Sequence, residues 1–204
     1  MPDGERGARC ARQRAMPSLH PTEHRGLREL FAFSRSLSTH WPQLAERLPA
    51  GRARPFRDGG LAAQELIAQL EVHAARYGLH GKPAAQGLGN SIGLTRAAVR
   101  NRFLEVNQAA RFALTEVAYL VGLLAYLRRV AETREDLTAR DFCAAWLERF
   151  EEVERQARAS AAELGADPDL AIEPYDPSLL GKAGHGVGFA IGTVGEWVDR
   201  KVGR

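Results

Sequence analysis

Polar side chains open the most regular apolar stretch of this chain, in RNRFLEVNQAARFALTE at residues 100–116. If the stretch is helical, Glu105, Gln108 and Arg111 share one face, because residues three or four positions apart are neighbours on a helix. Asn107 then lies on a second face beside Arg111. Such groups need hydrogen-bond partners when they are buried. We therefore expect an interhelical network that sets the helix register, with a ligand-binding or catalytic pocket as the alternative.

Two histidines could join such a pocket. His73 lies on a mostly apolar helical segment, a setting more typical of a hydrogen-bonded core residue than of a ligand. His80 lies in GLHGKPAAQGLGNSIG at residues 78–93, a glycine-rich stretch that could cover one end of a helical bundle. The candidate site residues are therefore Glu105, Asn107, Gln108, Arg111, His73 and His80.

Motifs for metals and nucleotides are lacking. A di-iron bundle requires two Glu-x-x-His motifs, and the sequence contains none. Cys10 and Cys143 are the two cysteines, too few for a cysteine-rich zinc site. The glycines of residues 78–93 lack the spacing of a dinucleotide fingerprint and follow a helix rather than a strand. We expect no metal and no cofactor, and an enzymatic function is not favoured.

A second unusual pattern is GHGVGFAIG, in which Gly184, Gly188 and Gly192 are four residues apart. Each glycine inside a helix costs up to about 1 kcal/mol relative to alanine, and this spacing lets two helices pack closely. Phe189 and Trp197 add apolar contacts. We expect the segment to pack against the chain's own bundle or a second copy. A membrane-surface contact through Trp197 and the basic end, or a loose tail, are the alternatives.

Helical periodicity predicts four helices that would position these groups. Trp41-Pro42 should break the first, and two prolines and three glycines predict a loop over residues 49–60. Gly78 is a natural end for the second, because glycine readily adopts the left-handed conformation. A capping-box pattern of Thr138 and Asp141 should open the fourth. The helices are expected at residues 22–40, 58–77, 95–132 and 138–164.

The third predicted helix carries the longest apolar run, VAYLVGLLAYL. We expect it to be a long central helix that its neighbours bury on every side. Trp146 should anchor the fourth helix against it. No segment shows the alternation of a strand, so the predicted fold is all-α, a four-helix bundle with up-down packing. The expected core residues of the central helix are Val117, Leu120, Val121 and Leu124.

Composition divides the chain into four parts. Residues 1–21 form a basic lead that we expect to be disordered. The bundle domain follows over residues 22–165. Three Asp/Glu-Pro pairs predict an extended, helix-free connector over residues 166–177, because a residue before proline disfavours the helical conformation. Residues 178–204 form a glycine-rich helical appendage.

The net charge of +3 comes mainly from arginines near the two ends, without an aromatic platform, so nucleic-acid binding is not indicated. The N-terminus lacks the apolar core of a secretory signal, and we expect a cytoplasmic protein. Our leading hypothesis is a helical interaction or scaffold protein that associates with itself or docks another protein through residues 178–204. The alternatives are a peripheral membrane or lipid-surface protein using the same segment, and a small bundle enzyme or ligand-binding protein using the polar residues of the third helix.

Overall fold

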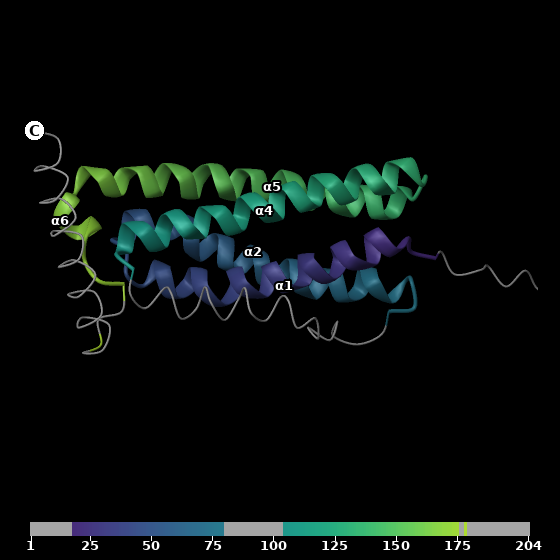
Figure 1. Ribbon diagram of the computed structural model, residues 1–204, viewed down its shortest axis with the longest axis horizontal. Helices are drawn as coiled ribbons and strands as arrows, with labels where there is room; N and C mark the ends of the chain where they lie inside the picture. The colour runs from purple at the N-terminus through teal and green to yellow at the C-terminus, as the bar shows by residue number, and fades with distance from the viewer. Residues whose placement is uncertain (1–17, 80–103, 176–177, 179–204) are drawn as a thin grey trace, which may run out of the picture.

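Four long amphipathic segments form the helices of this protein (Figure 1). The computed structural model describes residues 18–79, 104–175 and 178. Within these ranges there is no β-strand, which confirms the all-α prediction for the described part of the chain. The elements are α1 (Pro21–Ala45), α2 (Ala50–Ala75), α4 (Val106–Thr133), α5 (Leu137–Glu163), a 3₁₀ turn (Leu164–Ala166) and the short α6 (Pro168–Ala171).

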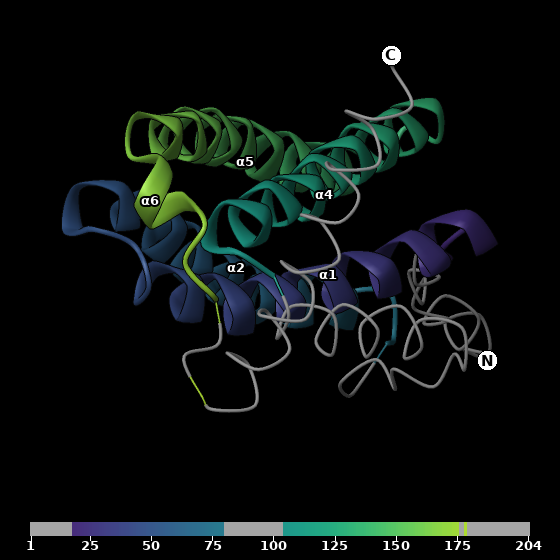
Figure 2. The same ribbon diagram turned by 60° about the vertical axis from the view of Figure 1, so that its left-hand side comes forward.

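The long helices form a bundle in which each has two main neighbours (Figures 1 and 2). α1 packs against α2 and α4, and α5 packs against the same two helices. α1 and α4 are antiparallel, since Thr22 near the start of α1 bonds to Tyr126 near the end of α4. α1 and α2 are antiparallel as well, so α2 and α4 run in the same direction. The end of α2 and the start of α4 therefore lie at opposite ends of the bundle, so the predicted up-down order does not hold between these two described helices.

The predicted helix break at Trp41-Pro42 and the predicted loop over residues 49–60 are both wrong. α1 continues through Pro42, and α2 continues through Pro55. A proline inside a helix removes a backbone hydrogen bond and costs about 3 kcal/mol or more. Tertiary packing offsets this cost, because Trp41 and Phe56 are fully buried and their rings lie 5.2 Å apart.

Glycines allow close contact between these helices. A Cβ atom on Gly59 would lie 2.5 Å from Trp41 Cε3, and one on Gly60 would lie 2.9 Å from Pro42 Cδ. A Cβ atom on Gly26 in α1 would lie 2.6 Å from Leu127 Cδ2 in α4. At three places in the described bundle, a glycine therefore leaves room for a side chain of the neighbouring helix.

The third predicted helix does not run unbroken from residue 95. Glu105 is the N-cap of α4, with an extended backbone (φ −73°, ψ 156°). Because the backbone of Glu105 is extended, α4 begins at Val106.

α4 is one of four helices of similar length rather than a central helix. Val117, Leu120 and Leu124 have no exposed surface, as predicted, whereas Val121 is only half-buried. The opposite face of α4 is exposed, so its neighbours bury it along a stripe and not on every side.

α5 carries the apolar stripe expected from the sequence, but its N-cap is Asp136 rather than Thr138. The Asp136 carboxylate accepts a hydrogen bond from the Ala139 N–H at 3.0 Å. Trp146 donates from Nε1 to Gln69 of α2 at 3.2 Å, so its polar contact is with α2 and not with the third predicted helix. The stripe residues, buried or packed against the core, are Phe142, Trp146, Phe150, Val153, Ala157, Ala161 and Leu164.

After α5 the chain returns to the start of α4. The connector predicted to be free of helix contains α6, so that local prediction is wrong. The Val106 N–H donates to the Glu173 carbonyl at 2.9 Å, and the Tyr175 N–H donates to the Leu104 carbonyl at 2.8 Å. The division into lead, connector and appendage stays a prediction, since residues 1–17 and 179–204 lie outside the described ranges.

Candidate functional site

The polar residues at the start of α4 form a cap network. The Glu105 N–H donates to Gln108 Oε1 at 3.4 Å, which is one half of a capping box. The Asn107 amide donates to Glu105 Oε2 at 2.8 Å and to the Ala171 carbonyl at 2.6 Å. Arg111 in turn donates to Asn107 Oδ1 at 2.8 Å. The structure therefore brings these four predicted residues together around the N-terminus of α4, where they link the helix to α6.

This arrangement favours the structural interpretation of the polar stripe. Glu105 is not inside the helix, so it does not continue a stripe along one face with Gln108 and Arg111. Asn107 uses both its donor and its acceptor groups within the network. The network holds α4, α6 and the returning chain in register.

His73 lies at the opposite end of the bundle, near the end of α2, so the structure does not bring it to the other candidates. It is 5% exposed, and its ring stacks on Phe142 of α5 at 4.3 Å. Burial lowers the pKa of His73, and the charge of Arg76 adds to this effect. The imidazole is therefore neutral at neutral pH. His80 lies outside the described residues.

Tyr77 and Asp136 form a polar pair beside His73 that residue types and spacing did not predict. Tyr77 Oη donates to Asp136 Oδ2 at 2.7 Å. Burial opposes the ionisation of Asp136, but hydrogen bonds from Ala139 and Tyr77, with nearby positive charges, hold its pKa below the usual value. An aspartate just before a helical run is an N-cap signal that could have predicted this role.

The thiol of Cys143 is not a nucleophile in this environment. The side chain is 2% exposed. Burial, and then the charge of Asp136, raise the pKa of Cys143 to about 12. A thiolate is the reactive form of cysteine, so at neutral pH this residue acts as a small apolar side chain of the core.

Asp136→Ala should lower the free energy of unfolding at neutral pH by about 1 kcal/mol, the typical cost of removing an aspartate cap. The folded-state pKa of Asp136 lies below its ordinary value of 3.8. The carboxylate therefore stabilises the fold above that pH, and this contribution is lost as the pH falls through the folded-state value. Urea unfolding of the two proteins should differ less at about pH 2 than at neutral pH. Asp169→Ala, at an exposed residue of α6, is the control, and a difference that does not change with pH would contradict the assignment.

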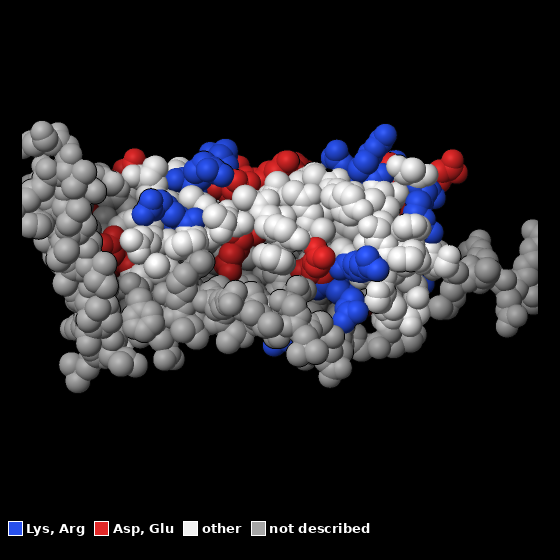
Figure 3. Space-filling model, in the orientation of Figure 1, with Lys and Arg blue, Asp and Glu red and all other residues white. Residues whose placement is uncertain are grey.

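An exposed aromatic face runs along α4. Phe112, Tyr119 and Tyr126 are seven residues apart and lie along one side of the helix, with 36%, 46% and 49% of their surfaces exposed. Thr115 and Gly122 are exposed between them. Figure 3 shows uncharged surface over α4, beside charged side chains over α5. We call these five residues the α4 aromatic face.

Contacts with α1 hold the two tyrosines of this face. Tyr119 Oη donates to Glu29 Oε2 at 2.8 Å, and the Tyr119 ring stacks on Phe33 at 4.2 Å. The hydrogen bond to Glu29, together with burial, raises the pKa of Tyr119, so the hydroxyl remains a donor at neutral pH. Tyr126 Oη shares a hydrogen bond with Thr22 Oγ1 at 2.6 Å. The hydroxyls are satisfied within the chain, and what stays exposed is largely apolar ring surface.

Gly122 has a different environment from the glycines of the helix contacts. Apart from its chain neighbours and the adjacent backbone of α4 itself, no atom of a described residue lies within 4 Å of the position that a Cβ atom would occupy. A glycine in the middle of a helix costs about 1 kcal/mol relative to alanine. Nothing in the described part of the chain offsets this cost at Gly122.

Among the described helices, α4 alone is long and apolar enough to cross a membrane. The core helix of a bundle can have the same composition, and Val117, Leu120 and Leu124 are fully buried against neighbouring helices. Packing within the bundle therefore accounts for part of the apolar character of α4, since 33% of its apolar window is buried.

The predicted interaction segment lies outside the described residues, including Gly184, Gly188, Gly192, Phe189 and Trp197. In the part of the chain that is described, no three His, Cys, Asp or Glu side chains are grouped so that they could hold a metal ion. Comparisons with models of known protein families, with curated proteins and with solved structures give no match.

Proposed function

We propose that this protein is a helical interaction protein that associates with itself through the α4 aromatic face. In this proposal, α4 of one copy lies antiparallel to α4 of a second copy. The glycine-faced segment of residues 178–204 is a second proposed contact, with the bundle or with the other copy. The observation that carries the proposal is Gly122, a mid-helix glycine with open space at its Cβ position in the middle of an exposed aromatic face.

The order of large and small residues on this face suits an antiparallel pair. Large residues stand at positions 112, 119 and 126, and the small residues Thr115 and Gly122 stand between them. In one antiparallel register, Tyr119 of each copy lies against Gly122 of the other, and Tyr126 lies against Thr115. Both copies make the same contacts, as a two-fold interface requires. Each tyrosine of this face then meets a small residue, which is the condition for close helix packing.

The bundle itself supports this role for glycine. Gly26 and Gly59 each accept a large side chain of a neighbouring helix, Leu127 and Trp41, at distances that exclude a Cβ atom. Gly122 also leaves room for a large side chain, but no side chain from the described part of its own chain packs against it. A tyrosine ring of a second copy would supply the missing contact.

Gly122→Leu should abolish self-association, although leucine favours a helix far more than glycine does. Gly122→Ala should weaken the dimer by at least about tenfold, which is about 1.4 kcal/mol, while it stabilises the isolated chain. Helix propensity thus predicts that replacing Gly122 stabilises the chain, whereas packing predicts that it weakens the dimer. Sedimentation equilibrium of the full chain measures the dissociation constant, and thermal unfolding measures stability.

Gly51→Ala is the matched control, because Gly51 is a helical glycine of α2 with no described atom near its Cβ position. It should leave the dimer unchanged. A wild-type chain that stays monomeric, or a Gly122→Leu variant that keeps the mass of two chains, would contradict the proposal. Gly188→Leu in the same assay tests the proposed contact of residues 178–204. Flotation of the wild-type protein with liposomes tests the alternative of a membrane-surface contact.

A further inference from the structure

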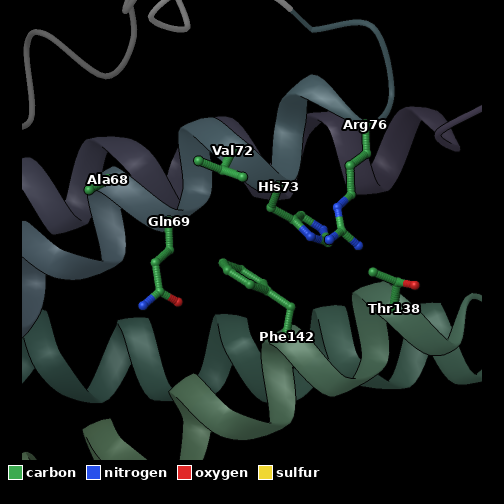
Figure 4. Close-up of a pocket in the computed structure, with 7 residues that line it drawn as sticks. All are labelled: Ala68, Gln69, Val72, His73, Arg76, Thr138 and Phe142. Atoms are coloured by element: carbon green, nitrogen blue, oxygen red, sulfur yellow. The ribbon is translucent and has the colours of Figure 1, made fainter.

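A groove of about 520 Å³ lies between α2 and α5, at the end of the bundle opposite the α4 cap network (Figure 4). This volume is within the range of small-molecule sites in proteins. The lining combines polar and apolar groups from two helices that are far apart in the sequence. The residues are Ala68, Gln69, Val72, His73 and Arg76 of α2, with Thr138 and Phe142 of α5.

His73 is the buried polar group of this groove. It is 5% exposed, and its ring is fixed by stacking on Phe142 at 4.3 Å and by an edge contact with Tyr77 at 5.3 Å. Neither ring nitrogen has a hydrogen-bond partner among the described residues. These nitrogens are not among the fully buried unpartnered atoms of the described residues, so they are reached from the groove. Its position in the groove lining therefore leaves His73 available to a ligand.

Arg76 gives the groove a positive charge. No described carboxylate lies within ion-pair distance of its guanidinium group. The charge of Arg76 acts on His73, and both side chains line the groove (Figure 4). The groove lining contains no Asp or Glu. Asp136, whose charge acts on His73, already accepts hydrogen bonds from Tyr77 and Ala139.

The other lining groups add hydrogen-bond donors and an apolar surface. The oxygen of the Gln69 side chain accepts from Trp146, which leaves the amide NH₂ as a donor. Thr138 supplies a hydroxyl group. Val72 is 67% exposed at the groove, and Phe142 lies across from it on α5. A ligand that suits this lining has a negative charge at one end and an apolar body.

We infer that this groove binds a small organic carboxylate with a planar apolar group. The carboxylate lies at Arg76 and His73, because an arginine and a carboxylate form charge-assisted hydrogen bonds. The apolar group packs on Val72 and the exposed part of Phe142. This site is separate from the α4 aromatic face and does not depend on self-association.

Benzoate is the probe for this site, tested with the full chain by isothermal titration calorimetry and by the ring-proton NMR signal of His73. We expect a dissociation constant of about 1 mM or lower and a shift of the His73 signal on binding. Arg76→Gln should weaken binding by about tenfold or more, through loss of a charge-assisted contact. Arg76 is exposed, so this variant should keep its fold.

Arg57→Gln, at an exposed arginine on the same helix outside the groove, is the matched control and should leave the dissociation constant unchanged. Benzamide has the same ring without the charge, and acetate has the charge without the ring, so both should bind at least about tenfold more weakly than benzoate. Three results would overturn the inference: no binding of benzoate, equal loss in the two arginine variants, or binding without a change at His73.

Discussion

Leu124→Ala is expected to lower the free energy of unfolding by about 2–5 kcal/mol, the range for a leucine-sized cavity in a protein core. Leu124 has no exposed surface and belongs to the apolar core that the four long helices share. Its removal would leave a cavity that helices fixed on both sides cannot fully close. Urea titration followed by circular dichroism measures the change.

Leu61→Ala is the matched control, because Leu61 is a helical leucine of α2 with 51% of its surface exposed. Its replacement should change the stability by about 0.5 kcal/mol or less, as is usual for surface positions. A cost below about 1 kcal/mol for Leu124→Ala would place α4 at the edge of the bundle and contradict the packing described here.

Gly59→Ala should destabilise the bundle by about 1–3 kcal/mol, the usual cost of overpacking a core. The added methyl group would lie 2.5 Å from Trp41 Cε3 and 2.9 Å from Val153 Cγ1. Alanine is the better helix former by about 1 kcal/mol, so propensity alone predicts the opposite sign. Thermal and urea unfolding of the variant decide between the two effects.

A double-mutant cycle identifies the cause of this loss. Trp41→Leu removes the ring that the new methyl group would meet, so Gly59→Ala should cost less in that background than in the wild type. Gly51→Ala is the control for helix propensity, since no described atom lies near its Cβ position. Equal costs of Gly59→Ala with and without Trp41 would show that the close contact between α1 and α2 is not the reason.

The proposed self-association and the proposed carboxylate site depend on different residues. Gly122 and Tyr119 lie on α4, whereas His73 and Arg76 lie on α2 and face α5. A Gly122→Leu variant should therefore still bind benzoate, and an Arg76→Gln variant should still form the dimer. Either proposal can fail without the other.

Helical periodicity in the sequence was sufficient to predict the helix-forming character of the bundle and most of its core. Leu120 and Leu124 follow the apolar period of α4, and both are fully buried. Gly78 follows α2 with a φ of 73°, the left-handed conformation for which glycine is the usual choice. These features depend on neighbours within a few residues along the chain, and a single sequence contains that information directly.

The prolines and glycines of α1 and α2 could not be interpreted in the same way. Pro42 and Gly60 are signals of a break or a loop when they are judged locally, yet both lie inside helices and face each other. Their local costs are of the order of 1–3 kcal/mol each. Burial of side chains such as Trp41 in a shared core offsets those costs, and this contribution comes from contacts with residues distant in the sequence.

The polar residues show the same difference between local sequence signals and contacts that depend on tertiary packing. Asn107 and Arg111 were recognisable as a polar group from their helical spacing, but only the fold shows that they serve a cap tied to Ala171. His73 was recognisable as an unusual residue, but its groove exists only because α2 and α5 pack antiparallel and bring Phe142 against it. Residue types and spacing on one helix are local properties of the sequence. Which two helix faces meet is decided by the packing of the whole bundle.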